Sequence, residues 1–139
     1  MRRHLVVDAE GTPLGFELSG ANRHDSKMLA AVLDVIPGVR RGRSRPRCRP
    51  RKLHADKAYD HRRCRAECRA RSIAPRIARR GVERSDRLGR HRWVVERTLA
   101  WLARFRRLTI RYERRADIHR AFTSLACSLI CLNQIRRFC

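Results

Sequence analysis

The amino-acid sequence predicts one α/β domain in which helices pack on a mixed sheet. Short apolar or alternating segments, typical of strands, occur between longer segments with apolar residues at the helical period. The chain has 139 residues, an ordinary length for one domain, and 42% of them are hydrophobic. That share is too high for a disordered basic tail, so we expect residues 1–139 to fold as a single domain.

The first elements are predicted to be a β-hairpin and a helix. An apolar run at 5–7 and an alternating run at 14–18 flank a turn that contains glycine and proline. Asp25 or Ser26 is then expected to cap a helix, which Pro37 and Gly38 end. The apolar positions of this helix are Met28, Leu29, Val32, Leu33 and Ile36.

The middle of the chain is predicted to contain two short strands on either side of a helix. Residues 40–51 are almost entirely Arg, Pro, Gly and Ser, which predicts a basic flexible loop. Residues 52–55 form a short strand that ends at Asp56, and Asp60 is expected to cap the helix that follows. The second strand is expected at 73–77.

The C-terminal part is predicted to be mainly helical. After a basic loop at 79–90, we expect a helix over 91–105, an extended segment at 108–112 and a final helix from Asp117. The expected buried residues of the first helix are Trp93, Val94, Leu99, Trp101, Leu102 and Phe105. The final helix repeats apolar residues at intervals of three and four in an amphipathic stripe, namely Ile118, Phe122, Leu125, Leu129 and Leu132.

The charge of the chain indicates a polyanionic partner. Lys and Arg number 35 against 13 Asp and Glu, which gives a formal net charge of +22, and nearly all the cations are arginine. The planar guanidinium suits phosphate oxygens, so double-stranded DNA or another nucleic acid is the natural partner, although arginine-biased codon usage would also raise the count. The longest apolar stretch, 121–132, has only the length of a buried helix, so we expect no membrane partner and a cytoplasmic, nucleoid-associated protein.

The cysteines leave two interpretations open. Cys64 with Cys68, and Cys127 with Cys131, are pairs at four-residue spacing, so each pair lies on one helix face. Four thiolates can hold zinc, but zinc sites more often use two-residue gaps on tight turns. Reduced core thiols of a cytosolic protein are the favoured interpretation.

Two carboxylates stand in positions suited to chemistry. Asp56 follows a short strand, the usual place for a functional group in an open α/β sheet, and Glu96 lies among arginines on a helix. Acids from separate elements can hold the two ions of a phosphoryl-transfer site, which lie about 3.5 to 4 Å apart. The alternative is that Asp56 only ends a strand and that Glu96 only pairs with Arg92 on the helix surface.

At these residues the chain resembles the DDE transposases of bacterial insertion sequences, in the insertion-sequence-4-like superfamily and of the insertion-sequence-5 type. The resemblance rests on blocks in family order, including LHADKAYD and HRWVVERTLAWLARFRRL, that lie at residues 4–15, 20–26, 53–60, 91–108 and 111–121. It implies a ribonuclease H-like mixed sheet with flanking helices, a Mg²⁺ or Mn²⁺ cofactor, and cutting and joining of DNA ends.

The resemblance also implies roles for particular residues. Asp56 matches the second catalytic aspartate and Glu96 the catalytic glutamate, so both are expected to be catalytic residues and metal ligands. Gly89 and Ala103 stand where the family has a tyrosine and a lysine, with Arg104 as the expected substitute for the lysine. The residues expected to contact DNA are Lys57, Arg90, Arg92, Arg97 and Arg104.

The resemblance finally implies that the chain is the C-terminal part of the catalytic domain, truncated at its N-terminus. The family's first aspartate lies on a central strand upstream of the hairpin, so the sheet is expected to lack that strand. In the implied sheet Asp8 would lie two strand spacings, roughly 9 to 10 Å, from the strand that ends at Asp56. We therefore interpret Asp8 as a turn residue.

Two functions from different classes follow. The first is DNA transposition by a metal-dependent DDE transposase that is incomplete in this chain. The second is a catalytically inactive basic fragment that competes for or assembles on transposon ends. The expected partners are transposon ends, a second copy of the chain or an upstream transposase segment, and a preference for RNA would instead indicate an RNA-binding protein.

Overall fold

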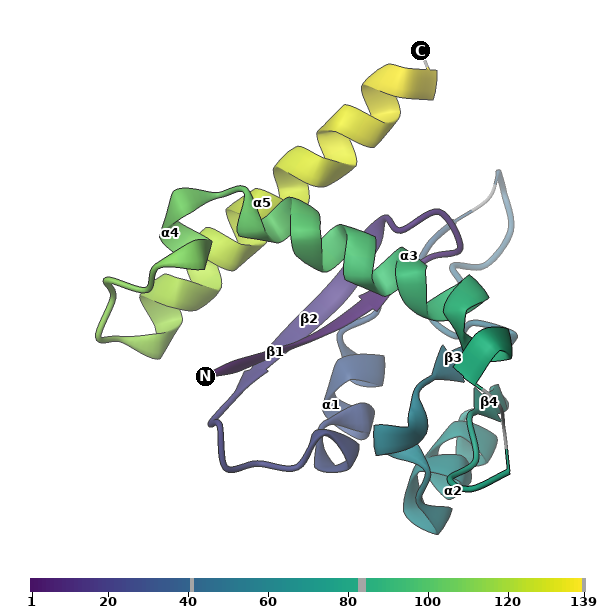
Figure 1. Cartoon of the computed structure of the whole chain (residues 1–139). Coiled ribbons are helices and arrows are strands. Elements are labelled where there is room, and N and C mark those ends of the chain that lie inside the picture. The colour runs from purple at the N-terminus through teal and green to yellow at the C-terminus, as the bar shows by residue number, and fades with distance from the viewer. Residues whose placement is uncertain (41, 83–84, 139) are drawn as a thin grey trace. The chain divides into compact units, whose positions relative to one another are not determined.

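A computed structural model describes residues 1–40, 42–82 and 85–138, with the side chains at 85–88, 90 and 138 outside the description. The chain forms two compact units, of which the first comprises Met1–Val6 and Leu14–Arg92. The second comprises Val7–Pro13 and Trp93–Cys139. Strands and helices follow one another along the chain, which confirms the α/β class (Figure 1).

The predicted hairpin is present. Strands β1 (Arg2–Val7) and β2 (Pro13–Ser19) pair with each other, and their short connection is compatible only with an antiparallel arrangement. In the turn, Asp8 Oδ1 accepts hydrogen bonds from the backbone N–H groups of Glu10 at 2.9 Å and Thr12 at 2.8 Å. Asp8 is therefore a turn residue, as its position in the sequence predicted.

The two predicted central strands are also confirmed. Strands β3 (Lys52–Ala55) and β4 (Ala74–Ile77) are parallel, with Ala55 opposite Ile77. Helix α2 (Arg62–Ala70) lies between them in the chain and forms the crossover. Within the described ranges, β1–β2 and β3–β4 are two separate two-stranded sheets.

The core of the first unit lies around α1 (Leu29–Asp34), α2 and β4, which pack a common set of apolar side chains. This set consists of Val6, Met28, Leu29, Val32, Leu33, Ile36, Cys64, Cys68, Ile73 and Ile77. Cys64 and Cys68 have no exposed surface, which agrees with the interpretation as core thiols. Burial raises the pKa of both thiols, so they remain protonated at neutral pH.

Two predicted helix caps were wrong. The segment before α1 is a short 3-10 helix, η1 (Asp25–Lys27), whose first N–H groups are capped by His24 through a 3.2 Å bond from Ser26 N–H to Nδ1. Asp25 instead accepts from Arg2 Nη1 at 3.0 Å. His61 rather than Asp60 stands at the N-cap of α2, and no side chain caps that helix.

The second unit contains most of α3 (Ser85–Ala103), α4 (Arg106–Thr109) and α5 (Ala116–Phe138). The prediction of a loop at 79–90 was wrong from Ser85 onward, because the backbone is helical there. The extended segment predicted at 108–112 was also wrong in part, because α4 occupies its beginning. Of the described helices, none combines the length and the hydropathy needed to cross a membrane.

The buried faces of α3 and α5 differ from the predicted ones. On α3, Val94 and Leu102 are buried as expected, but Trp93 is 48% exposed. On α5, the buried residues are His119, Thr123, Ala126 and Ile130, whereas most of the predicted stripe is exposed, with Leu125 at 62%. The helix therefore packs through a different face from the predicted one, and most of its large aliphatic residues lie on the surface.

Candidate functional site

Asp56 lies at the carboxyl end of β3, at the same edge where the parallel strand β4 ends. The residue is exposed and begins a short 3-10 helix, η2 (Lys57–Tyr59). Its Oδ1 atom accepts a 2.9 Å hydrogen bond from the Ala58 N–H. Asp56 therefore caps a turn, because one of its oxygens accepts from a backbone N–H. Its carboxylate remains on the surface.

Asp60 holds the turn that carries Asp56. Its two carboxylate oxygens accept from the Arg80 backbone N–H at 2.8 Å and from Arg65 Nη2 at 2.7 Å. Arg80 Nε also donates to the Lys57 carbonyl at 3.0 Å, so η2 is tied to the segment after β4. The Arg80 N–H bond, followed by that of Arg65, lowers the pKa of Asp60, which keeps the carboxylate ionised. This role of Asp60 was not predicted from the sequence, although two acids four residues apart after a strand were a visible signal.

Two aromatic groups lie close to this end of β3. His54 stacks on His91 with ring centroids 3.8 Å apart. Burial, and then the neighbouring His91, lower the pKa of His54, so its ring is neutral at neutral pH. Burial and then the charges of Asp25 and Asp56 raise the pKa of Tyr59, which therefore keeps its phenolic proton.

Glu96 is exposed on α3, in the second unit. The opposite side of this helix is attached to the hairpin turn, because Thr98 Oγ1 donates to the Gly11 carbonyl at 2.6 Å. Arg97 also donates to the Glu10 carbonyl through Nη2. The backbone that carries Glu96 is therefore fixed by contacts that do not involve its carboxylate.

The cationic residues predicted to contact DNA occupy different environments. Arg97 lies between two indole rings, with its guanidinium carbon 4.4 Å from the Trp93 centroid and 4.9 Å from that of Trp101. Arg92 and Arg104 are exposed, and Lys57 is partly buried. The side chain of Arg90 lies outside the described residues.

Asp56 and Glu96 are the two carboxylates predicted to hold a metal ion. Asp56 belongs to the first unit and Glu96 to the second. Across the described ranges, no three His, Cys, Asp or Glu side chains gather in a way that could hold a metal ion, which applies to zinc as well as to magnesium. Exposed carboxylate oxygens are nevertheless the donor type that Mg²⁺ and Mn²⁺ prefer.

Comparison with known proteins decides the family. The family described as the transposase DDE domain matches residues 1–131, which is nearly the whole chain. The chain belongs to this transposase family. It is also 53% identical, over 136 residues, to a putative transposase for insertion sequence element IS402 from Burkholderia cepacia.

The match to this relative covers 98% of the present chain but 64% of the relative's length. No solved structure matches the chain significantly. Membership of the transposase family confirms the family-level resemblance drawn from the sequence blocks. The catalytic and DNA-contacting roles of individual residues in this transposase chain stay predictions.

Proposed function

We propose that the chain acts in DNA transposition as part of a DDE transposase of the insertion-sequence-5 type, with a ribonuclease H-like fold. The observation that carries this proposal is an exposed carboxylate, Asp56, at the carboxyl end of a parallel strand in a chain of the transposase family. Functional groups in open α/β folds gather at such ends. The hairpin β1–β2 and the parallel pair β3–β4 are compatible with the proposed fold.

In this proposal Asp56 and Glu96 are the catalytic acids and hold Mg²⁺ or Mn²⁺. When bound, such ions activate the attacking oxygen and stabilise the leaving oxygen during phosphoryl transfer. Asp60, through Arg65 and Arg80, positions the turn that presents Asp56. The packing of Thr98 on Gly11 positions the helix that presents Glu96.

The proposed partner is double-stranded DNA at the ends of an insertion element, bound through Lys57, Arg90, Arg92, Arg97 and Arg104. The formal net charge of +22 supports such a partner, because guanidinium groups form paired hydrogen bonds with phosphates. A second copy of the chain or an upstream transposase segment would assemble on the same DNA.

The test is metal-dependent cleavage of DNA that carries the ends of insertion sequence element IS402. Asp56→Asn and Glu96→Gln are each expected to abolish cleavage in Mg²⁺ or Mn²⁺. The thermal midpoint should change little, because both residues are exposed and Asn retains the Oδ1 acceptor for Ala58. Glu10→Gln removes one exposed charge and retains the carbonyl that Arg97 contacts, so it serves as the matched control.

Two results would overturn the site assignment. Either acid variant could cleave as well as the control, or could unfold the chain while the specific activity of the folded fraction persists. If the unaltered chain binds the DNA ends but never cleaves them in either metal, the inactive DNA-binding fragment becomes the better description.

The DNA contacts are tested by salt dependence. The logarithm of affinity for duplex DNA falls by about 0.9 per phosphate contact for each logarithmic unit of salt. Arg92→Gln should therefore lower this slope by about 0.9, whereas Arg69→Gln, an exposed arginine on α2, should not. Equal slopes for the two variants would contradict a specific role for Arg92.

A further inference from the structure

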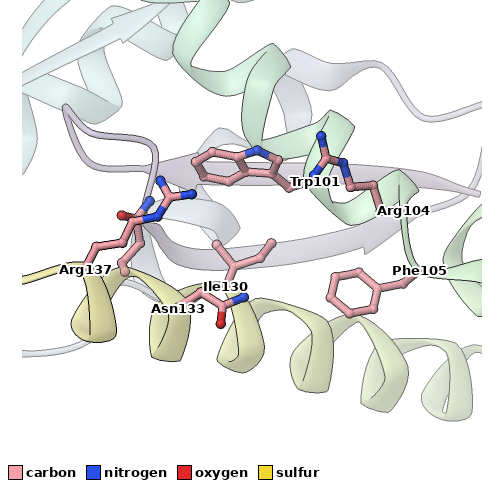
Figure 2. Close-up of a pocket in the computed structure, with 7 residues that line it drawn as sticks. Trp101, Arg104, Phe105, Ile130, Asn133 and Arg137 are labelled. Carbon is pink, nitrogen blue, oxygen red and sulfur yellow. The ribbon is translucent and has the colours of Figure 1, made fainter.

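A pocket of about 160 Å³ opens in the second unit between the end of α3 and the last turns of α5. We call it the α3–α5 pocket. Figure 2 shows Trp101 and Arg104 on one side and Ile130, Asn133 and Arg137 on α5. The lining residues are Trp101, Arg104, Phe105, Ile130, Asn133, Gln134 and Arg137.

The α5 side of the pocket continues the face through which this helix packs. That face is buried up to Ile130, which is 6% exposed. Further along, the same face presents Asn133, Gln134 and Arg137 to the pocket. The α5 side of the pocket is therefore built from groups that can form directed hydrogen bonds.

The lining is cationic and aromatic. The described residues that line the pocket include no acidic side chain. Among all the residues that the structure describes, Arg104 and Arg137 have no ion-pair partner. In Figure 2 the two guanidinium groups flank the indole ring of Trp101. The Arg97 guanidinium over the same indole, 4.9 Å from its centroid, helps to hold the ring in place.

These groups select a ligand with a phosphate and a planar ring. Arginines bind phosphate oxygens through their fork of N–H groups, indole and phenyl rings stack on bases, and side-chain amides pair with base edges. An acidic peptide would use the two arginines but would leave the ring and the amides unused. The pocket is also well below the roughly 300–1,000 Å³ of small-molecule and cofactor sites, so it suits part of one nucleotide.

We infer that the α3–α5 pocket binds part of one unpaired nucleotide of a single DNA strand. The phosphates lie between Arg104 and Arg137, and the base lies against Trp101. A paired base cannot reach the ring, because both of its faces are stacked within the duplex. The inference rests on the proposed function only in taking DNA as the partner, and it does not depend on cleavage.

The test measures binding of a fluorescein-labelled oligothymidylate and of a blunt duplex to the full chain by fluorescence anisotropy. The pocket variant is Arg137→Gln. The control is Arg136→Gln, which removes the same charge from a neighbouring exposed position outside the pocket. We expect the pocket variant to bind the oligothymidylate about tenfold more weakly than the control does, with equal duplex affinity in the two variants.

Trp101→Phe gives a second readout that is independent of charge. Because a smaller ring stacks less strongly, this variant should weaken oligothymidylate binding several-fold and leave duplex binding unchanged. Thymidine monophosphate should displace the oligonucleotide more effectively than a tetraglutamate peptide does. Thermal unfolding of every variant verifies that the fold is retained.

Equal losses in the pocket and control variants, or equal losses on single-stranded and duplex DNA, would overturn the inference. More effective displacement by tetraglutamate would overturn it in favour of an acidic peptide. Absence of metal-dependent cleavage together with selective oligothymidylate binding would contradict the proposed function and leave the pocket assignment standing.

Discussion

The hydroxyl of Thr98 donates a 2.6 Å hydrogen bond to the carbonyl oxygen of Gly11, so the hairpin turn is attached to the middle of α3. The Thr98 side chain has no exposed surface, and its hydroxyl also lies 3.1 Å from the Val94 carbonyl. A buried hydroxyl needs such acceptors, because an unsatisfied one costs about 1–3 kcal/mol. The contact therefore fixes α3 two residues away from Glu96.

Gly11→Ala should destabilise the second unit. Gly11 has φ +87°, which side-chain-bearing residues rarely adopt, and an added Cβ would lie 2.9 Å from Thr98 Oγ1 and 3.0 Å from Arg97 Nη2. Strain and crowding together are expected to cost about 2–4 kcal/mol, measured by urea or thermal unfolding. Gly42→Ala is the control, since Gly42 has φ +61° and its Cβ would meet nothing within 4 Å. It should lose only about 1–2 kcal/mol from backbone strain, and equal losses would contradict a packed contact at Gly11.

Two leucines should differ sharply in their contribution to stability. Leu102 on α3 has no exposed surface, so Leu102→Ala should lower the free energy of unfolding by about 2–5 kcal/mol. Leu125 on α5 is 62% exposed, so Leu125→Ala should change it by only about 0.5 kcal/mol. Chemical denaturation of both variants measures the two changes in the free energy of unfolding. A large loss at Leu125 would mean that this side of α5 is covered in solution.

Acid should weaken the first unit through His4. The ring is 4% exposed and lies 2.7 Å from Ser19 Oγ, and burial lowers its pKa from the ordinary value of 6.5. Because the folded chain then binds fewer protons than the unfolded chain, stability is retained above pH 6.5 and falls as the pH decreases below it. Thermal midpoints between pH 8 and 5 should show this decline, with a smaller decline in His4→Gln. An identical decline in the variant would assign the acid sensitivity to other groups.

His91→Gln should raise the pKa of His54. Burial is the first cause of the lowered pKa, and the stacked ring of His91, at 3.8 Å, is the second. Without His91 the His54 ring gains access to water and loses the electrostatic effect of the neighbouring ring, so protonation becomes easier. Titration of the histidine ring protons by NMR measures the change. A His54 pKa that stays the same or falls would show that the two rings are not stacked in solution.

Much of the fold was predictable because its signals are local. The hairpin, the strands β3 and β4 and the turn role of Asp8 followed from alternating apolar residues and from turn-forming residues within a few positions. The position of Asp56 at the end of β3 was predictable for the same reason. The cap at His24 was not, because Asp25 forms its bond with Arg2, which lies 23 positions away in the chain.

The sequence by itself determined most of the segments that form helices and strands, the strongly cationic composition and the residues that carry the family resemblance. Only the tertiary structure decided which face of each helix is buried and which strands pair. On α5 both the Leu125 face and the Thr123 face have helical spacing, and periodicity cannot distinguish a stripe of large side chains on the surface from one in the core. The tertiary packing buries the Thr123 face, although its side chains are less apolar than those of the Leu125 face. In the same way, strand pairing depends on backbone hydrogen bonds between distant segments, which a local pattern does not specify.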